Sequence, residues 1–124
     1  MSVEMQIDVR GILELRRKLD RLDQNVRGYV DDALSFEVEA MRMLAQSLAP
    51  ERTGYLASTI FAERTSEWAF KLGARAPYAF FVEFGTRFMQ ARRFLTRALE
   101  LNIPGLVQRV NRALGETILE VAAS

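Results

Sequence analysis

The chain has 124 residues, 49% of them hydrophobic, with 17 basic and 16 acidic side chains and neither cysteine nor histidine. These values are typical of one folded, soluble domain, and a net charge of +1 supplies no overall attraction to nucleic acid or an anionic membrane. Without cysteine and histidine the chain cannot build disulfides, thiolate or imidazole catalysts, or the usual transition-metal sites.

No segment of the sequence suits a membrane or secretion. No apolar run approaches the roughly 18 to 20 residues that cross a bilayer. The first ten residues, MSVEMQIDVR, lack the basic and then apolar order of a signal peptide. We therefore expect a protein that is made and kept in a cytoplasm and has no membrane partner.

A short strand and a short helix are expected first. Residues 3–9 alternate apolar and polar side chains, with the apolar ones on one side, which is the period of a half-buried strand. Residues 11–22 repeat leucine and isoleucine at helical spacing and end at a polar stretch.

The clearest element is a helix over residues 26–48, where apolar side chains recur every three or four positions. Four more apolar residues fall on the flank of this stripe and widen it to more than half the circumference: Tyr29, Phe36, Ala40 and Met43. One neighbour rarely covers so wide an arc.

Glu37 projects near the middle of the same stripe, where an unpaired carboxylate is costly to bury. It therefore has either an arginine partner or a place at a water-filled edge. A catalytic carboxylate would need a second acid or a base close by, and the sequence shows no obvious one.

A hairpin is expected next. Pro50 ends the long helix, and residues 51–56 form a loop or short turn. Residues 58–65 and 68–74 alternate as two strands, with the turn at 65–67. The second strand has four apolar residues on one face: Trp68, Phe70, Leu72 and Ala74.

Residues 76–95, APYAFFVEFGTRFMQARRFL, set five phenylalanines and a tyrosine around Glu83 and add three arginines. The part up to Phe84 is too short and too uniformly apolar to assign by periodicity, and Gly85 breaks it. Helical spacing returns over 91–101, is interrupted at residues 103–105 by Ile-Pro-Gly, and resumes in a last helix.

Together these elements predict one α+β domain over residues 1–124. A small antiparallel sheet, formed by the first strand and the hairpin, packs against one long helix. Further short helices and a C-terminal helix complete it.

The sequence offers little to an enzyme. Its glycines fit no phosphate-binding frame, and nothing in the spacing of Glu63, Glu67, Glu83 and Glu100 requires them to pair. We expect no catalytic residue, no cofactor and no metal.

Nucleic-acid binding is an alternative function. Arg87, Arg92, Arg93 and Arg97 are interleaved with Phe88 and Phe94, a composition that single-stranded nucleic-acid binders also use. Arg93 and Arg97, however, lie four apart on a predicted helix whose other side is apolar, as on a solvated or interface-rim face.

Contact with another protein explains more of residues 76–95. Aromatic residues and arginine are enriched at interface cores, and a small monomer should not leave a contiguous apolar patch open to water. We expect a neighbour to bury part of this surface.

Three blocks of the sequence resemble a tailed-phage family typified by gene product ten of a lambda-like phage, whose members are called tail-completion or head-tail joining proteins. The blocks are APERTGYLASTI at 49–60, APYAFFVEFGT at 76–86 and MQARRFLTRAL at 89–99. They cover about fifty residues in the family's order. Family members commonly have proline where this chain has Arg93, and often where it has Arg97, so the loop before the helix and its contacts are expected to differ here.

The resemblance implies a non-enzymatic virion protein that forms a ring, often of six copies, at the neck or the head-proximal end of the tail. Its partners would be further copies of itself, neighbouring neck or connector proteins, tail-tube or tail-terminator proteins, and DNA passing through the lumen. A ring uses two different faces of each subunit, which fits the two apolar regions of this chain.

We expect residues 77–84 to pack on the hairpin, Gly85 and Thr86 to make a tight turn, and residues 87–94 to reach a neighbouring subunit. Glu83 would accept hydrogen bonds or pair with Arg52 or Arg92, and Gly85 is required if its φ is positive. The predicted interface residues are Phe36, Met43, Phe80, Phe81, Phe84, Arg87, Phe88, Met89, Arg92, Arg93 and Phe94. The predicted turn residues are Arg52, Thr53, Gly54, Glu83, Gly85 and Thr86.

Overall fold

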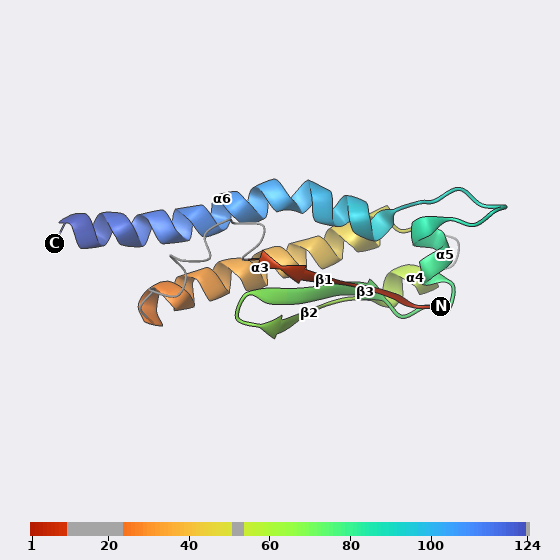
Figure 1. The fold of residues 1–124 in the computed structure, drawn as a ribbon, viewed down its shortest axis with the longest axis horizontal. Coiled ribbons are helices and arrows are strands. Elements are labelled where there is room, and N and C mark those ends of the chain that lie inside the picture. The colour runs from red at the N-terminus through yellow and green to blue at the C-terminus, as the bar shows by residue number, and fades with distance from the viewer. Residues whose placement is uncertain (10–23, 51–53, 124) are drawn as a thin grey trace.

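A computed structural model describes residues 1–9, 24–50 and 54–123 of the chain, with side chains for 1–9, 27–50 and 54–113. The elements are β1 (Val3–Asp8), α3 (Gln24–Leu48), α4 (Tyr55–Ser58), β2 (Ile60–Ser66), β3 (Ala69–Ala74), α5 (Ala79–Phe84) and α6 (Phe94–Ala123). The expected α+β architecture is confirmed: a three-stranded antiparallel sheet, a long helix packed on it and a long C-terminal helix (Figure 1). The helix expected at 11–22 lies outside the described residues.

The sheet has β3 at its centre, with β1 and β2 antiparallel on either side. Val3 and Ile60 both lie opposite Ala74, and Ile7 lies opposite Phe70. Alternation puts these apolar side chains on one face, where they are buried. The apolar faces predicted by the period of two are therefore confirmed for the first strand and for β3.

The hairpin bounds differ slightly from those expected. Because Tyr55–Ser58 forms the short helix α4, strand β2 begins only at Ile60. Ser66 pairs with Ala69, so the turn consists of Glu67 and Trp68 and lies later than 65–67. A bulge between Arg64 and Ser66 shifts the register before this turn.

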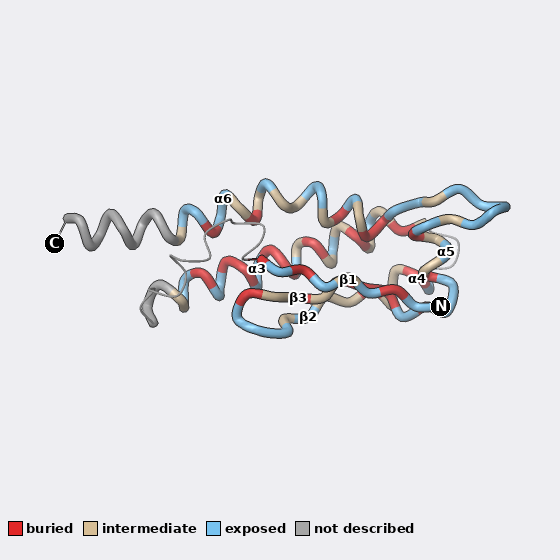
Figure 2. The backbone as a smooth tube through the Cα atoms, viewed as in Figure 1, coloured by how far each residue is buried: buried red, intermediate tan, exposed pale blue. Residues whose placement is uncertain are grey.

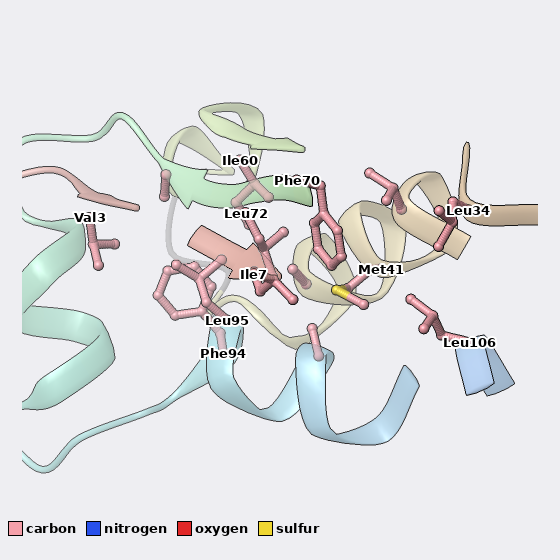
Figure 3. Close-up of a cluster of buried hydrophobic side chains, with 14 of the residues drawn as sticks. Val3, Ile7, Leu34, Met41, Ile60, Phe70, Leu72, Phe94, Leu95 and Leu106 are labelled. Atoms are coloured by element: carbon pink, nitrogen blue, oxygen red, sulfur yellow. The ribbon is translucent and has the colours of Figure 1, made fainter. Parts of the chain in front are cut away.

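The core lies between the inner face of the sheet, α3 and the first half of α6. Helices α3 and α6 pack side by side and run in opposite directions (Figure 1). Figure 2 shows the buried positions gathered where these layers meet, and Figure 3 shows side chains from all three layers together. Met41, Leu72 and Leu95 are fully buried there, and burial of such a side chain stabilises the fold by about 1.5–3 kcal/mol.

Helix α6 runs through Pro104, so the expected interruption at residues 103–105 is wrong. Proline removes one backbone hydrogen bond and disfavours a helix interior. Leu95 and Ala98 before it, and Leu106 and Val110 after it, are all fully buried. Packing on both sides of Pro104 therefore overrides the local preference, since tertiary contacts supply most of a helix's stability.

Glu37 has an arginine partner, which was one of the two arrangements expected for it. Its Oε1 lies 2.7 Å from Nε of Arg109 on α6, and the carboxylate side chain is 7% exposed. The guanidinium of Arg109 also lies 4.1 Å from the centroid of the Phe36 ring. This ion pair joins the two long helices and gives the acid a structural role.

None of the described helices combines the length and the apolar character that a membrane span requires.

Candidate subunit interface

Helix α5 gathers aromatic side chains at one end of the molecule. The ring of Phe80 lies 5.8 Å from that of Phe81 and 4.9 Å from that of Phe84. The ring of Tyr55 on α4 lies 6.3 Å from that of Tyr78, next to α5. We call this group, Tyr55, Tyr78, Phe80, Phe81 and Phe84, the aromatic end. All of it except the half-buried Phe80 is exposed.

The packing of α5 differs from expectation. Its main neighbours are β1 and α6, whereas the hairpin was expected to support it. The amide of Phe80 donates to the carbonyl of Met1 at 2.8 Å, which fixes α5 beside the first strand. Ala79 and Glu83, four residues apart, form the buried side of this helix.

Glu83 is the most deeply buried acidic side chain that the structure describes, with 0% exposure. Its Oε2 accepts the amide of Leu95 at 2.9 Å, and its Oε1 accepts the amide of Thr96 at 3.1 Å and the Thr96 hydroxyl. These amides belong to the first turn of α6, where helix N–H groups lack internal partners and the dipole favours an anion.

Glu83 therefore caps α6 from a different helix. The expectation that it accepts hydrogen bonds is confirmed, although the groups that it holds belong to α6. The tight turn expected at Gly85 and Thr86 lies instead at Arg87 and Phe88, between the paired Thr86 and Met89. The alternative partner Arg92 does not pair with it in the described part of the chain, and Arg52 and Thr53 lie outside that part.

Between α5 and α6 the chain makes a projecting loop, residues 85–93, which we call the arm (Figure 1). Thr86 and Met89 exchange two backbone hydrogen bonds, 2.8 and 3.3 Å long, that close its tip. At its base, the amides of Arg92 and Arg93 donate to the carbonyls of Val82 and Glu83 at 2.8 and 3.2 Å. The arm is thus tied to α5 at both ends.

Gly85 begins the arm with φ 79° and ψ 173°, a backbone region that only glycine enters readily. A Cβ there would lie 2.7 Å from the amide nitrogen of Ala91 and 2.9 Å from the carbonyl oxygen of Met89. The condition under which glycine was expected to be required, a positive φ, is met at Gly85, and the returning chain adds a second reason for glycine. Gly54 also has a positive φ, 74°, before α4.

The arm exposes the residues that the sequence singled out. Phe88 is 92% exposed, and Met89 is also exposed. Arg87, Arg92 and Arg93 are exposed on the same segment. Phe94 is different: it is fully buried at the start of α6, so the prediction that it contacts a neighbour is wrong. Its position one residue after the arm puts it inside the core (Figure 3).

Arg93 is the only non-glycine residue with positive φ in the described part of the chain, at 47°. A proline ring holds φ near −65°, so proline cannot adopt this turn. We expect Arg93→Pro to lower the free energy of unfolding by more than about 2 kcal/mol, through strain and loss of the bond to Glu83. Arg93→Gly is expected to raise it by up to about 1 kcal/mol.

Urea unfolding of these two variants, with Arg93→Ala as the control for loss of the side chain, measures the effect. Equal effects of glycine and proline would show that the backbone at this position carries no strain.

A second apolar surface lies along α3. Tyr29, Phe36 and Met43 are 59%, 56% and 59% exposed and are spaced by seven residues. At about 100° per residue they lie within about 20° of one line along the helix. We call them the α3 row. The wide apolar arc of this helix is therefore covered by the sheet and α6 only in part.

Acidic side chains border this row. Asp32 and Glu39 are exposed and lie about 40° and 60° from the line of the row. Hydrogen bonds from Arg42 hold the pKa of Glu39 below its usual value, so this carboxylate stays charged. The row thus has an apolar line and an ionised edge.

Comparison with protein families, with curated proteins and with solved structures finds no match. The resemblance to phage tail-completion proteins therefore stays a prediction that the three sequence blocks carry.

Two of the other glutamates named from the sequence have ion-pair partners, and Glu100 is exposed. Glu63 pairs with Arg75 at 3.1 Å, and Glu67 lies 3.7 Å from Arg27. Within the described residues, no three acidic side chains gather where they could hold a metal ion. Within the described residues, the exposed large apolar side chains other than Met1 and Leu101 belong to the arm, the aromatic end or the α3 row.

Sequence reasoning missed several residues of these surfaces. Tyr29 was placed on the helix flank but not at an interface, although its spacing of seven from Phe36 was a usable signal. Tyr55 and Tyr78 meet only after α4 and α5 form, so no linear pattern links them.

Proposed function

We propose that this chain is a structural subunit that assembles with copies of itself into a closed ring at the head-tail junction, or the head-proximal end of the tail, of a tailed phage. There it completes the tail and joins it to the head. It acts through surfaces and not through catalysis, and needs no cofactor. The resemblance of the three sequence blocks supplies the location and the number of copies, six.

The observation that carries the proposal is the exposure of Phe88 on an arm with a fixed backbone. Because the Phe88 side chain is 92% exposed, it buries almost no apolar surface and does not stabilise the fold of the single chain. Four backbone hydrogen bonds, two across its tip and two at its base, hold the arm in place nevertheless. A rigid projection with an aromatic tip loses little entropy when it binds, which suits it to a contact with another protein.

The presence of two unlike apolar surfaces supports a ring. The arm and the aromatic end lie at one end of the molecule, and the α3 row lies along helix α3, which reaches that end only at its C-terminus (Figure 1). When one surface binds a different surface on the next copy, the contact is heterologous and generates a closed ring if the rotation closes.

Phe88→Ser is expected to separate folding from assembly. Because Phe88 makes little contact with its own chain, the free energy of unfolding should change by less than about 0.5 kcal/mol. Loss of an aromatic anchor should weaken self-association by at least about tenfold, which corresponds to 1.4 kcal/mol. Sedimentation velocity measures the association, and thermal unfolding checks the fold.

Unchanged self-association of the Phe88→Ser protein would contradict the proposed role of the arm. The location is tested by electron microscopy of intact phage particles that carry a tagged subunit. The proposal requires the tag in a ring at the neck or the top of the tail, and a tag elsewhere on the particle would contradict it.

Binding of single-stranded nucleic acid is the second candidate, because Arg87 lies beside the exposed Phe88 and Arg92 and Arg93 are exposed on the same arm. A salt titration with an oligothymidine decides between the two. Three phosphate contacts on a single strand give a slope of about −2 in log affinity against log salt. That slope, lost when the three arginines are replaced by serine, would favour this second function.

A further inference from the structure

The arm carries the chemistry of one half of an interface. Residues 85–93 include three arginines and no acidic residue, together with Phe88 and Met89. The guanidinium of Arg87 lies 5.8 Å from the centroid of the Phe88 ring, at the tip of the arm. The arm therefore presents an apolar tip with one arginine beside it and two further arginines at its base.

The α3 row carries the complementary chemistry. Its apolar line is bordered by the acidic Asp32 and Glu39 on one side and by Arg109, paired with Glu37, on the other. With Arg42 beside Glu39, these five charged groups sum to −1, because three are acidic and two are basic. An arginine of the arm can approach Asp32 while Phe88 or Met89 lies on the apolar line.

One chain cannot join its own arm to its own row. The arm extends beyond the end of the fold at which α3 ends, and it points away from that helix (Figure 1). Both surfaces are exposed in the single chain (Figure 2), so each is free for another copy.

We propose that the arm of one subunit docks on the α3 row of the next, with Phe88 as the anchor and Asp32 as the main acidic partner of the arm's arginines. This inference rests on the proposed self-assembly and specifies which two faces meet. It also assigns Tyr29, Phe36 and Met43 to the receiving surface. The docking does not use the aromatic end, which would contact either the edge of the same interface or a neighbouring protein of the neck or tail.

Cysteine cross-linking tests this pairing, because the chain has no cysteine of its own. Gln90→Cys places a thiol on the exposed arm and leaves Phe88 in place. Ser47→Cys places one on the line of the row, four residues after Met43, by a nearly isosteric change. The two full-length variants carry tags of different size, are mixed, and are treated with a short bismaleimide.

The matched control replaces Ser47→Cys with Gln6→Cys, which is exposed on the outer face of the sheet. We expect the mixed product with Ser47→Cys to exceed that with Gln6→Cys by at least about tenfold. Asp32→Lys added to the Ser47→Cys chain should reduce the product at least about threefold.

Light scattering on the same mixtures separates the two proposals. If the chains self-associate but the two cysteine pairs give equal product, the docking of the arm on the α3 row is wrong and self-assembly stands. If the chains neither associate nor cross-link, both the docking and the proposed function are overturned.

Discussion

Replacing Glu83 by alanine is expected to lower the free energy of unfolding by about 3 kcal/mol. The buried carboxylate accepts two amides of the first turn of α6 and the hydroxyl of Thr96. Removing it leaves buried donors without partners, at roughly 1–3 kcal/mol for each such group, and removes the negative charge at the helix N-terminus. Urea unfolding followed by circular dichroism measures the loss.

Two controls locate the cause of this loss. Glu83→Gln keeps one acceptor oxygen but turns an NH2 group towards a donor, so it should lose roughly half as much. Glu100→Ala removes an exposed glutamate from the same helix and should change stability by less than about 0.5 kcal/mol. A Glu83→Ala protein as stable as the Glu100→Ala protein would show that the cap contributes nothing.

Gly85→Val is expected to lower the free energy of unfolding by more than about 3 kcal/mol and to abolish assembly. A β-branched residue at φ 79° is strained, and its Cβ would meet backbone atoms of Met89 and Ala91 that cannot move without opening the arm. The arm would lose the position that a neighbour requires. Unfolding and sedimentation of the same variant measure both effects.

Gly28→Ala is the matched control, and it is expected to change the free energy of unfolding in the opposite direction. Gly28 lies in α3, is exposed, and a Cβ there meets nothing within 4 Å. Alanine should therefore raise the free energy of unfolding by about 0.5–1 kcal/mol, since glycine is a poor helix former. If Gly85→Val formed particles as normal as those of Gly28→Ala, the arm would not need its present shape.

Periodicity predicted the elements whose apolar faces are regular. The first strand, the hairpin and the helix α3 were found in this way, because burial of one face imposes a period of 2 or 3.6. Glu37 was also predicted to need a partner, from the cost of burying a charge. Its partner Arg109, 72 positions later, could not be chosen from the sequence, since no local pattern brings α6 beside α3.

The errors have physical causes as well. Pro104 was predicted to break the helix because the sequence shows that proline disfavours a helix interior. The sequence does not show that residues on both sides of it are buried, and this packing offsets the free-energy cost of the proline. Phe94 was grouped with the arm because it follows the arginines. Its burial depends on where α6 begins, and Glu83 of another helix helps to set that point.

In the arm, some features could be predicted from residue type, whereas others depend on tertiary contacts. Gly85 was predicted as a turn residue from its type alone. The conformation of Arg93 was not predictable, because a φ of 47° at arginine is held by the bond to the Glu83 carbonyl and by the start of α6. Phe94, the residue after this turn, is fully buried, whereas Phe88 within the arm is exposed.

The central claim is that exposed apolar surface on one chain is covered by other copies of the same chain. Light scattering of the full-length protein after size-exclusion chromatography, over rising concentration, tests it most directly. The account predicts a mass that rises from 14.1 kDa towards about 85 kDa, the mass of six copies, and that rises much less for Phe88→Ser. A mass that stays at 14.1 kDa at every concentration, with Phe88→Ser indistinguishable from the parent protein, would contradict it.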